Sequence, residues 1–279
     1  MKTNRYIKKY HIKRYPFVLI VLLLAGMVNH SHAQLILGAR GTSMGQAVTA
    51  LPSETWNVFA NPALLPESGR SVSFYGIRYY NLAELTDVAL AGHYTHSIGS
   101  FGIGMHTFGD DLYRESRFRV GYSRGFQGFR AGIVVNYAHI SIDGVYGSAG
   151  TLVFDAGVAY ELVNGLWFGS RATNLSRSRI GRAKEELPRE LALGLSYQLN
   201  DRGMLSTDLV KDSRFPLSYR GGLEVRIIDQ LYMRGGITTE PLTYSAGLGY
   251  KQPSWKVNIV AQQHYVMGWN PGFDFHIHF

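Results

Sequence analysis

Residues 151–162 read Thr-Leu-Val-Phe-Asp-Ala-Gly-Val-Ala-Tyr-Glu-Leu, and they decide the fold of the chain. Apolar side chains take every second position from Leu152 to Leu162, and Asp155, Gly157 and Glu161 are among the residues between them. Successive side chains of a β-strand point to opposite faces of its sheet. The alternation therefore predicts a strand with one apolar face and one face of small or polar residues.

The same alternation recurs up to the last residue, Phe279. Segments with this pattern number about fourteen, near 71–80, 87–97, 100–109, 116–124, 128–140, 151–162, 166–175, 189–200, 203–211, 216–227, 230–238, 242–251, 255–266 and 270–279. Every second connection is a tight turn, and the alternate connections are expected to be longer, near 81–86, 110–115, 141–150, 175–188 and 267–271. Short periplasmic turns opposite longer outer loops are typical of membrane barrels.

Two architectures produce such strands, a soluble β-sandwich or barrel and a membrane-spanning barrel. Here the polar face is rich in Gly, Ser, Ala, Asn and Gln, as expected of a narrow packed lumen, and the apolar face ends in aromatic residues. We therefore expect an all-β fold, a transmembrane antiparallel up-and-down β-barrel of about fourteen strands over residues 71–279. Its outer face would contact outer-membrane lipid, and Phe279 on the last strand would be the signal for the barrel-assembly machinery.

The first 33 residues have the layout of a secretory signal peptide. A basic region precedes a 12-residue apolar run, Phe17 to Val28, and small residues follow, so that cleavage is expected between Ala33 and Gln34. A transmembrane anchor is the alternative, but a spanning helix needs about 20 apolar residues. Six of the 28 basic residues belong to this leader, and the remaining 22 nearly balance 20 acids. Nothing in this charge favours nucleic acid as a partner.

Residues 34–70 lack the alternation, and short helical pieces and turns are expected there. Three motifs stand out in this segment: Gly38-Ala39-Arg40, Met44-Gly45 and Asn61-Pro62-Ala63. With the hairpins that follow, they resemble the fatty-acid transporter (FadL-like) superfamily of outer-membrane barrels, and within it the PorV/PorQ branch associated with type IX secretion. The resemblance implies that residues 34–70 fold into the barrel as a plug. A simple periplasmic tail is the alternative.

The sequence offers little enzyme chemistry. There is no Cys, which excludes thiolate nucleophiles, thiolate metal sites and disulfides. His276 and His278 share a face at strand spacing, but no cluster of acids completes a metal site. Nucleophile elbows and phosphate-binding Gly loops are absent from the sequence. We therefore expect no enzyme activity and no cofactor.

Charged residues recur on the predicted lumen face of the strands. They are Arg117, Arg119, Arg130, Asp155, Glu161, Arg171, Arg220, Glu224, Arg226, Arg234, Lys256 and Asp274. They either form an ionic pathway or pair across the lumen and hold the plug. Pairing is favoured, because an unpaired charge in a narrow interior is costly.

Two functions follow from these expectations. The resemblance implies an accessory to protein secretion or surface presentation, with secretion-system proteins as partners of loop 175–188 or the plug. The alternative is passive transport of a small hydrophobic solute, which predicts an apolar pocket near residues 34–70 and a lateral gap between strands. A purely structural barrel also remains open at this point.

Overall fold

The structure is a computed structural model that describes residues 37–144, 147–264 and 268–279. The expected signal peptide and its cleavage site, Ala33–Gln34, lie outside these residues. Within the described ranges, no helix has the length and apolar character needed to cross a membrane.

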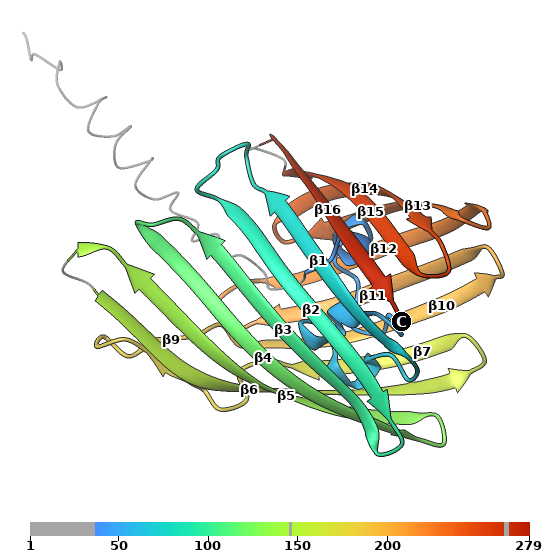
Figure 1. The fold of residues 1–279 in the computed structure, drawn as a ribbon, viewed down its shortest axis with the longest axis horizontal. Helices are drawn as coiled ribbons and strands as arrows, with labels where there is room; N and C mark the ends of the chain where they lie inside the picture. The colour runs from blue at the N-terminus through green and yellow to red at the C-terminus, as the bar shows by residue number, and fades with distance from the viewer. Residues whose placement is uncertain (1–36, 145–146, 265–267) are drawn as a thin grey trace, which may run out of the picture. The chain divides into compact units, whose positions relative to one another are not determined.

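Fourteen strands form one closed barrel, which confirms the expected fold (Figure 1). In chain order they are β1 (Arg70–Arg78), β2 (Thr86–His96), β3 (Gly99–Gly109), β4 (Tyr113–Phe126), β5 (Phe129–Ile142), β6 (Gly147–Val163), β7 (Leu166–Ala172), β10 (Glu190–Asn200), β11 (Gly203–Asp212), β12 (Leu217–Ile228), β13 (Leu231–Thr239), β14 (Leu242–Lys251), β15 (Trp255–His264) and β16 (Gly268–His278). Each strand pairs antiparallel with its neighbours along the chain, except that β7 is followed in the barrel by β10.

The barrel closes where its first strand meets its last. β1 pairs antiparallel with β16 from Ser71 opposite His278 to Ile77 opposite Gly272. The backbone N–H of Phe279 extends this seam by donating to the carbonyl oxygen of Arg70 at 3.0 Å. Closure matters because each unpaired N–H or C=O group in hydrocarbon costs several kcal/mol.

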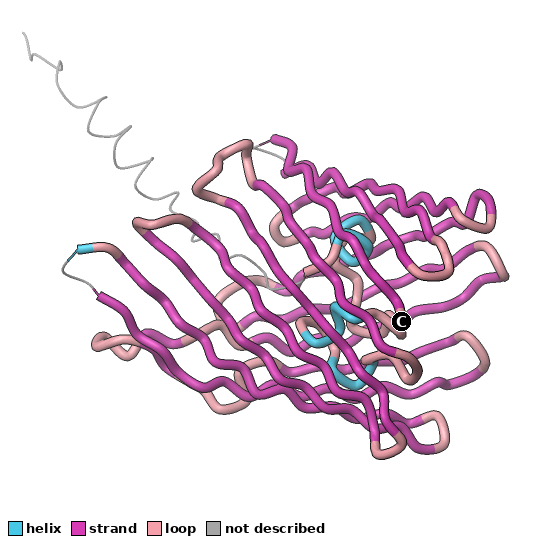
Figure 2. Tube along the Cα trace, in the orientation of Figure 1, coloured by secondary structure: helices cyan, strands magenta, loops and turns pink. Residues whose placement is uncertain are grey.

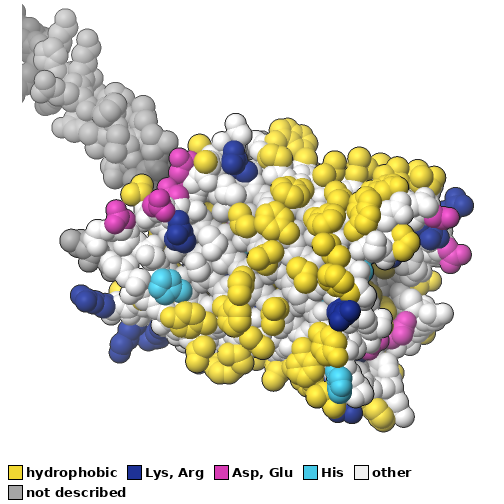
Figure 3. Space-filling view, in the orientation of Figure 1, with side chains coloured by type: hydrophobic (Ala, Val, Ile, Leu, Met, Phe, Trp, Pro, Cys, Tyr) yellow, Lys and Arg dark blue, Asp and Glu magenta, His cyan; other side chains and the backbone are white. Residues whose placement is uncertain are grey.

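The two faces of the wall differ in the way that the alternation predicted. On β6, Leu152 and Phe154 are exposed on the outside, whereas Val153 and Asp155 are buried inside. Figure 3 shows hydrophobic side chains spread over the middle of one outer face, with most of the visible charged side chains near its two ends. An apolar outer belt with charges restricted to its margins is the surface of a membrane-spanning barrel.

Most of the long loops expected from the sequence are shorter in the structure. Residues 113–115 belong to β4, and β5 and β6 together take up most of residues 141–150. The expected loop bounds were too wide because residues such as Arg114, Glu115 and Ser141 interrupt the alternation where the strands extend beyond the apolar belt, although the hydrogen-bonded ladder continues there.

The connection between β7 and β10 is long, as expected, but it has structure of its own. It carries a small two-stranded hairpin, β8 (Arg179–Ile180) and β9 (Glu185–Glu186). Strands of two residues are too short for alternation to reveal, so the sequence could not predict them.

Residues 37–65 form short helical pieces and turns inside the ring of strands (Figure 2). The pieces are α2 (Ala39–Ser43), η1 (Thr55–Val58) and η2 (Pro62–Leu64), and nearly every side chain in them is buried. Asn61 caps η2, because its side-chain oxygen accepts from the Ala63 N–H at 3.1 Å and Pro62 supplies a fixed first position.

We expect a charge on the outer belt to destabilise the barrel according to its depth. Leu195 lies midway along β10, and Leu199 lies on the same face beside the turn to β11. Leu195→Arg should cost about 2–4 kcal/mol of unfolding free energy, and Leu199→Arg about 0–1. Equilibrium unfolding in lipid vesicles measures both values, and equal costs would contradict the membrane belt.

Candidate functional site: the filled lumen

Arg40 joins the N-terminal segment to the barrel wall. Its Nε and Nη2 donate to the two carboxylate oxygens of Glu224 on β12, at 2.8 and 2.7 Å. Its Nη1 donates to Glu54 of the same N-terminal segment at 2.7 Å. The guanidinium thus makes a bidentate contact with the wall and a second contact within the segment, which fixes its position and its orientation.

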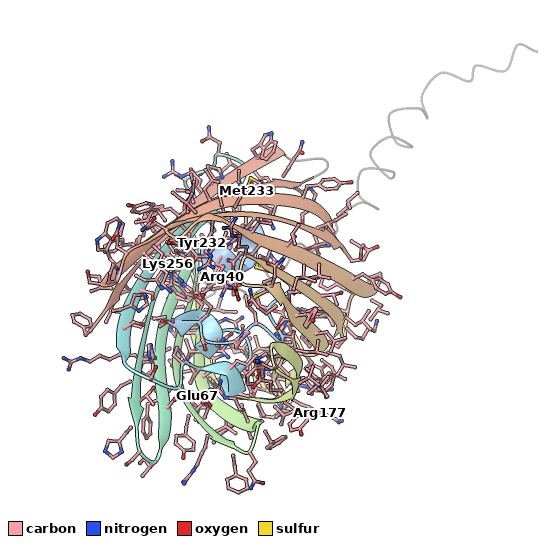
Figure 4. All side chains as sticks on the ribbon, turned by 90° about the vertical axis from the view of Figure 1, so that its right-hand side faces the viewer. Arg40, Glu67, Arg177, Tyr232, Met233 and Lys256 are labelled. Carbon is pink, nitrogen blue, oxygen red and sulfur yellow. The ribbon has the colours of Figure 1, made fainter. Side chains whose placement is uncertain are left out.

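A continuous network extends from Arg40 to residues of four strands, β12, β13, β15 and β16. Glu54 also contacts Lys256 at 3.2 Å, and Glu224 accepts from Arg234 at 2.5 Å. Arg234 donates to Asn258 at 2.8 Å, Asn258 donates to Asp274 at 2.5 Å, and Asp274 accepts from the backbone N–H of Ala39 at 2.7 Å. Figure 4 shows Arg40 and Lys256 close together within the ring of strands. The network balances three cations against three carboxylates.

The two charged residues of the N-terminal segment stabilise each other's ionised forms. Burial by itself would lower the pKa of Arg40, but the carboxylates of Glu224 and Glu54 raise it above its ordinary value. Burial would likewise raise the pKa of Glu54, but Lys256, Arg40 and His276 hold it well below its ordinary value. Both groups are therefore charged at neutral pH.

Glycine on the strands makes room for the backbone of the N-terminal segment. A Cβ atom at Gly236 would lie 2.0 Å from the backbone nitrogen of Gly45, and one at Gly222 would lie 2.4 Å from the carbonyl oxygen of Met44. A Cβ at Gly132 would meet the Pro62 backbone at 2.5 Å. No real Cβ contact is that short, so the small inner face predicted from the sequence is the surface on which Met44-Gly45 and Asn61-Pro62 rest.

Two polar side chains hold the turns between the helical pieces. Asp208 on β11 accepts from the backbone N–H groups of Val48 and Thr49 at 3.0 and 2.9 Å, and from the Thr49 hydroxyl at 2.7 Å. The Asn61 amide donates to the carbonyl oxygens of Thr49 at 2.7 Å and of Val158 at 3.2 Å. The bonds to Val48 and Thr49 satisfy backbone groups of a turn that lies outside any helix or strand.

An apolar cluster lies between the N-terminal segment and the wall. Trp56, Phe59, Leu37 and Leu65 meet inward-facing residues of four strands; the wall side consists of Tyr75, Ile77, Ala89, Ala91, Val134 and Val260. Trp56 packs edge-on against Tyr75 with ring centroids 5.8 Å apart. The sequence analysis expected an apolar pocket here, and the structure shows an apolar lining that the segment's own side chains fill.

The charges expected in the lumen are mostly buried and paired. Arg119 pairs with Asp155, Arg171 with Glu190, and Arg234 with Glu224. Arg220 lies 3.6 Å from Glu190, and Arg130 lies 3.2 Å from Glu67. Arg117 lies 3.7 Å from Glu115 near one end of the barrel. Glu161 accepts from the N–H of Gly165 at the β6–β7 turn. Arg226 is half-buried near the β12–β13 turn.

The sequence analysis missed several acids of the interior, of which Glu190 pairs with Arg171 and Arg220, and Asp87 lies 2.6 Å from His106. Asp208, Glu190 and Asp87 are inward-facing and buried or nearly so. Extending the alternation along residues 203–211 would have placed Asp208 on the lumen face. Glu190 and Asp87 stand at strand ends, where the pattern has too few neighbours to assign a face.

The histidine pair at the C-terminus belongs to the same interior. The Nδ1 of His276 lies 2.6 Å from the Ser73 hydroxyl and its Nε2 lies 3.1 Å from Asp274, while His278 stacks on it with centroids 6.2 Å apart. Among the residues that the structure describes, no group of three or more His, Cys, Asp or Glu side chains is placed to hold a metal ion.

Comparison with known proteins places the fold. Neither a protein-family model nor a curated protein sequence matches the chain. Several solved structures do match it. The CymD monoaromatic hydrocarbon channel superposes with a TM-score of 0.69 at 11% identity, covering 89% of this chain and 99% of that one. The P. putida toluene transporter TodX gives 0.69 at 12% identity, with 88% and 99% covered. A Pseudomonas aeruginosa FadL homologue gives 0.51 at 11% identity, with 88% and 99% covered.

These likenesses concern the fold, because the identities are low. They confirm the expected fold, a closed fourteen-strand antiparallel barrel that CymD and TodX share. Membership of the FadL-like superfamily, and of its PorV/PorQ branch, stays a prediction. The first two neighbours are themselves described as a monoaromatic hydrocarbon channel and a toluene transporter.

We expect Arg40→Met to loosen the N-terminal segment. The variant takes one cation from each of two largely buried carboxylates, Glu224 and Glu54, which keep only Arg234 and Lys256. Breaking a buried pair typically costs about 3–5 kcal/mol. Amide hydrogen exchange of residues 37–65 should accelerate by roughly a hundredfold or more. Arg179→Met is the matched control, because it breaks an exposed ion pair with Glu186. Such pairs contribute about 0–1 kcal/mol, so its exchange should stay near wild type.

Acid should loosen the same segment through Glu54. Its pKa in the folded protein is below the ordinary value of 4.5. The stability that it contributes is therefore complete above that value and is lost as pH falls below it. We expect exchange of residues 37–65, corrected for intrinsic rates, to rise below about pH 4.5. Glu54→Gln should already exchange faster at pH 7 and depend less on acid; an unchanged acid response would show that Glu54 is not the group responsible.

Proposed function

We propose that the chain is a passive outer-membrane channel for small hydrophobic solutes, and that residues 37–65 act as its plug. In this proposal residues 1–33 direct export and are removed, residues 34–70 form the plug region and residues 71–279 form the barrel. The partners are outer-membrane lipid, the barrel-assembly machinery during insertion, and a hydrophobic small molecule as cargo. No catalytic step and no cofactor are involved.

The apolar cluster at the plug is the observation that carries this proposal. Packing of Trp56 and its neighbours on this apolar strip stabilises the closed state, and in this proposal the same strip receives an apolar solute when the segment withdraws. Here Tyr75, Ile77, Ala89 and Ala91 of β1 and β2 would become a continuous apolar surface if Trp56 and its neighbours withdrew. Burying an apolar solute there would replace the contacts that the plug gives up, at roughly 25 cal/mol per Å².

The lumen charges are compatible with this function because they are paired. The network from Arg40 to Asp274 spans β12 to β16, whereas the apolar strip is centred on β1 and β2. A solute that follows the strip would pass beside charges that have partners among the described residues, including Asp87 of β2, which lies 2.6 Å from His106.

A second apolar group lies at the far end of the barrel, under the hairpin of β8 and β9. Ile180 and Leu187 of this connection pack on the inward-facing Ala138 and Val153. β7 ends at Ala172, so the connection itself completes the outer part of the β6 edge: the N–H of Leu175 donates to the carbonyl oxygen of Phe154 at 2.8 Å. This interruption of the strand ladder is our candidate for the lateral gap expected from the sequence.

The secretion-accessory reading has less support. It rests on the resemblance to the PorV/PorQ branch alone, and most connections at the end that carries the β8–β9 hairpin are short. Those connections offer little surface to a large protein partner. The channel is therefore the function that we put forward.

Uptake by whole cells tests the channel. Cells that express the full chain should take up a radiolabelled aromatic hydrocarbon several-fold faster than cells without it, but should take up an anionic aromatic of similar size no faster. Arg40→Met should raise hydrocarbon uptake further, because its plug opens more often, while Arg179→Met should match wild type. Equal uptake with and without a correctly folded barrel would overturn the proposal.

A further inference from the structure

A polar notch of about 200 Å³ lies at the end of the barrel that carries the tight turns. It is bounded by the β2–β3 turn, the β4–β5 turn and the chain between the plug and β1; the residues that matter are Glu67, His96, Ser100, Ser123, Arg124 and Arg130. Figure 4 labels Glu67 well apart from Arg40 and Lys256, so the notch is distinct from the Arg40 network. In a membrane barrel this end faces the periplasm.

Two buried groups in the notch have unused hydrogen-bonding capacity. Among the described residues, the Ser123 hydroxyl and the Arg130 Nε make no hydrogen bond, although both residues are almost completely buried. Native proteins rarely leave such groups unsatisfied without a reason. The carboxylate of Glu67 lies 3.2 Å from the Arg130 Nε, but its own side chain is 62% exposed. The inner wall of the notch thus presents donors and a positive charge to an acceptor.

The inner wall itself is held in place by the chain that leaves the plug. Thr95 and Ser100 hydroxyls both donate to the carbonyl oxygen of Pro66, at 2.9 and 2.6 Å, and Arg130 Nη2 donates to that of Leu65 at 2.5 Å. These bonds fix the direction of the Arg130 guanidinium. The notch is therefore formed before anything binds to it.

The notch also crosses the rim of the barrel. Ser123 is buried on the lumen side, whereas its neighbour Arg124 and the more distant His96 are exposed on the outer face. Aromatic residues surround this outer part; Tyr94, Phe126 and Phe129 are 52%, 73% and 48% exposed. Aromatic side chains at a barrel rim mark the level of the lipid head groups.

We propose that this notch binds the head group of an anionic phospholipid from the periplasmic leaflet. The phosphate would accept from Arg124 on the outside and from Arg130 and Ser123 on the inside, displacing the Glu67 carboxylate, while the acyl chains lie along the aromatic outer face. A phosphodiester offers several acceptor oxygens to donors from different directions, which suits two arginines and a hydroxyl. The site needs only the membrane barrel, so its failure would leave the channel proposal intact.

Native mass spectrometry of the full chain in a neutral detergent tests the site, with phosphatidylglycerol, phosphatidylcholine and inorganic phosphate as separate probes. Phosphatidylglycerol should bind at least several-fold more tightly than phosphatidylcholine. Arg124→Gln and Ser123→Ala should each weaken it several-fold, and Glu67→Gln should strengthen it, because a competing carboxylate is removed. Arg202→Gln is the matched control: it removes an exposed charge from another turn at the same end of the barrel.

A heat-induced shift in gel mobility confirms that each variant is a folded barrel before it is compared. Equal binding of the two lipids, or equal losses in Arg124→Gln and Arg202→Gln, would overturn the proposal. Displacement of phosphatidylglycerol by inorganic phosphate at equal concentration would also overturn it, since the notch would then be a site for a free anion.

Discussion

Every other feature of this protein depends on the closure of β1 against β16. In the hydrocarbon core of a membrane there is no water to hydrogen-bond the N–H and C=O groups of an open sheet edge. A sheet that spans the membrane must therefore close on itself. Closure fixes the number of strands and hence the width of the lumen. It also brings Arg70 and Phe279 to one rim and sends the N-terminal segment into the interior. The seam is thus the reason that residues 37–65 have a cavity to fill.

Inside that cavity, shape and charge have separate tasks. Glycines such as Gly222 and Gly236 allow the backbone of the segment to approach the wall, but van der Waals contact alone does not fix the orientation of the segment. Arg40 supplies direction, since a planar guanidinium between two carboxylates accepts few orientations. Buried ion pairs seldom add much net stability compared with apolar packing. Their value here lies in specifying one docked position for the segment that precedes β1.

The interior therefore combines a specific attachment with an apolar strip. The network on β12 to β16 holds one side of the segment, and Trp56 with Phe59 covers the apolar residues of β1 and β2 on the other. In the channel that we propose, an apolar solute would compete with the packing and leave the ion pairs unchanged, so the segment would keep its attachment while part of it is displaced. This division of forces connects the fold to the channel that we propose.

The sequence by itself determined the strands, their faces, the barrel and many of the residues that carry charge into its lumen. It could do so because the alternation of apolar and polar residues is a local property, which can be recognised in each strand separately. It also placed Arg40, Met44-Gly45 and Asn61-Pro62 together in one unusual segment. It did not determine which acid meets which base, since Arg40 and Glu224 are 184 positions apart. Nor did it reveal the β8–β9 hairpin or the notch beside Arg130. Those features arise only when barrel closure and strand register bring residues that are distant in sequence to the same height in the barrel. Only the tertiary structure decides which residues meet in this way.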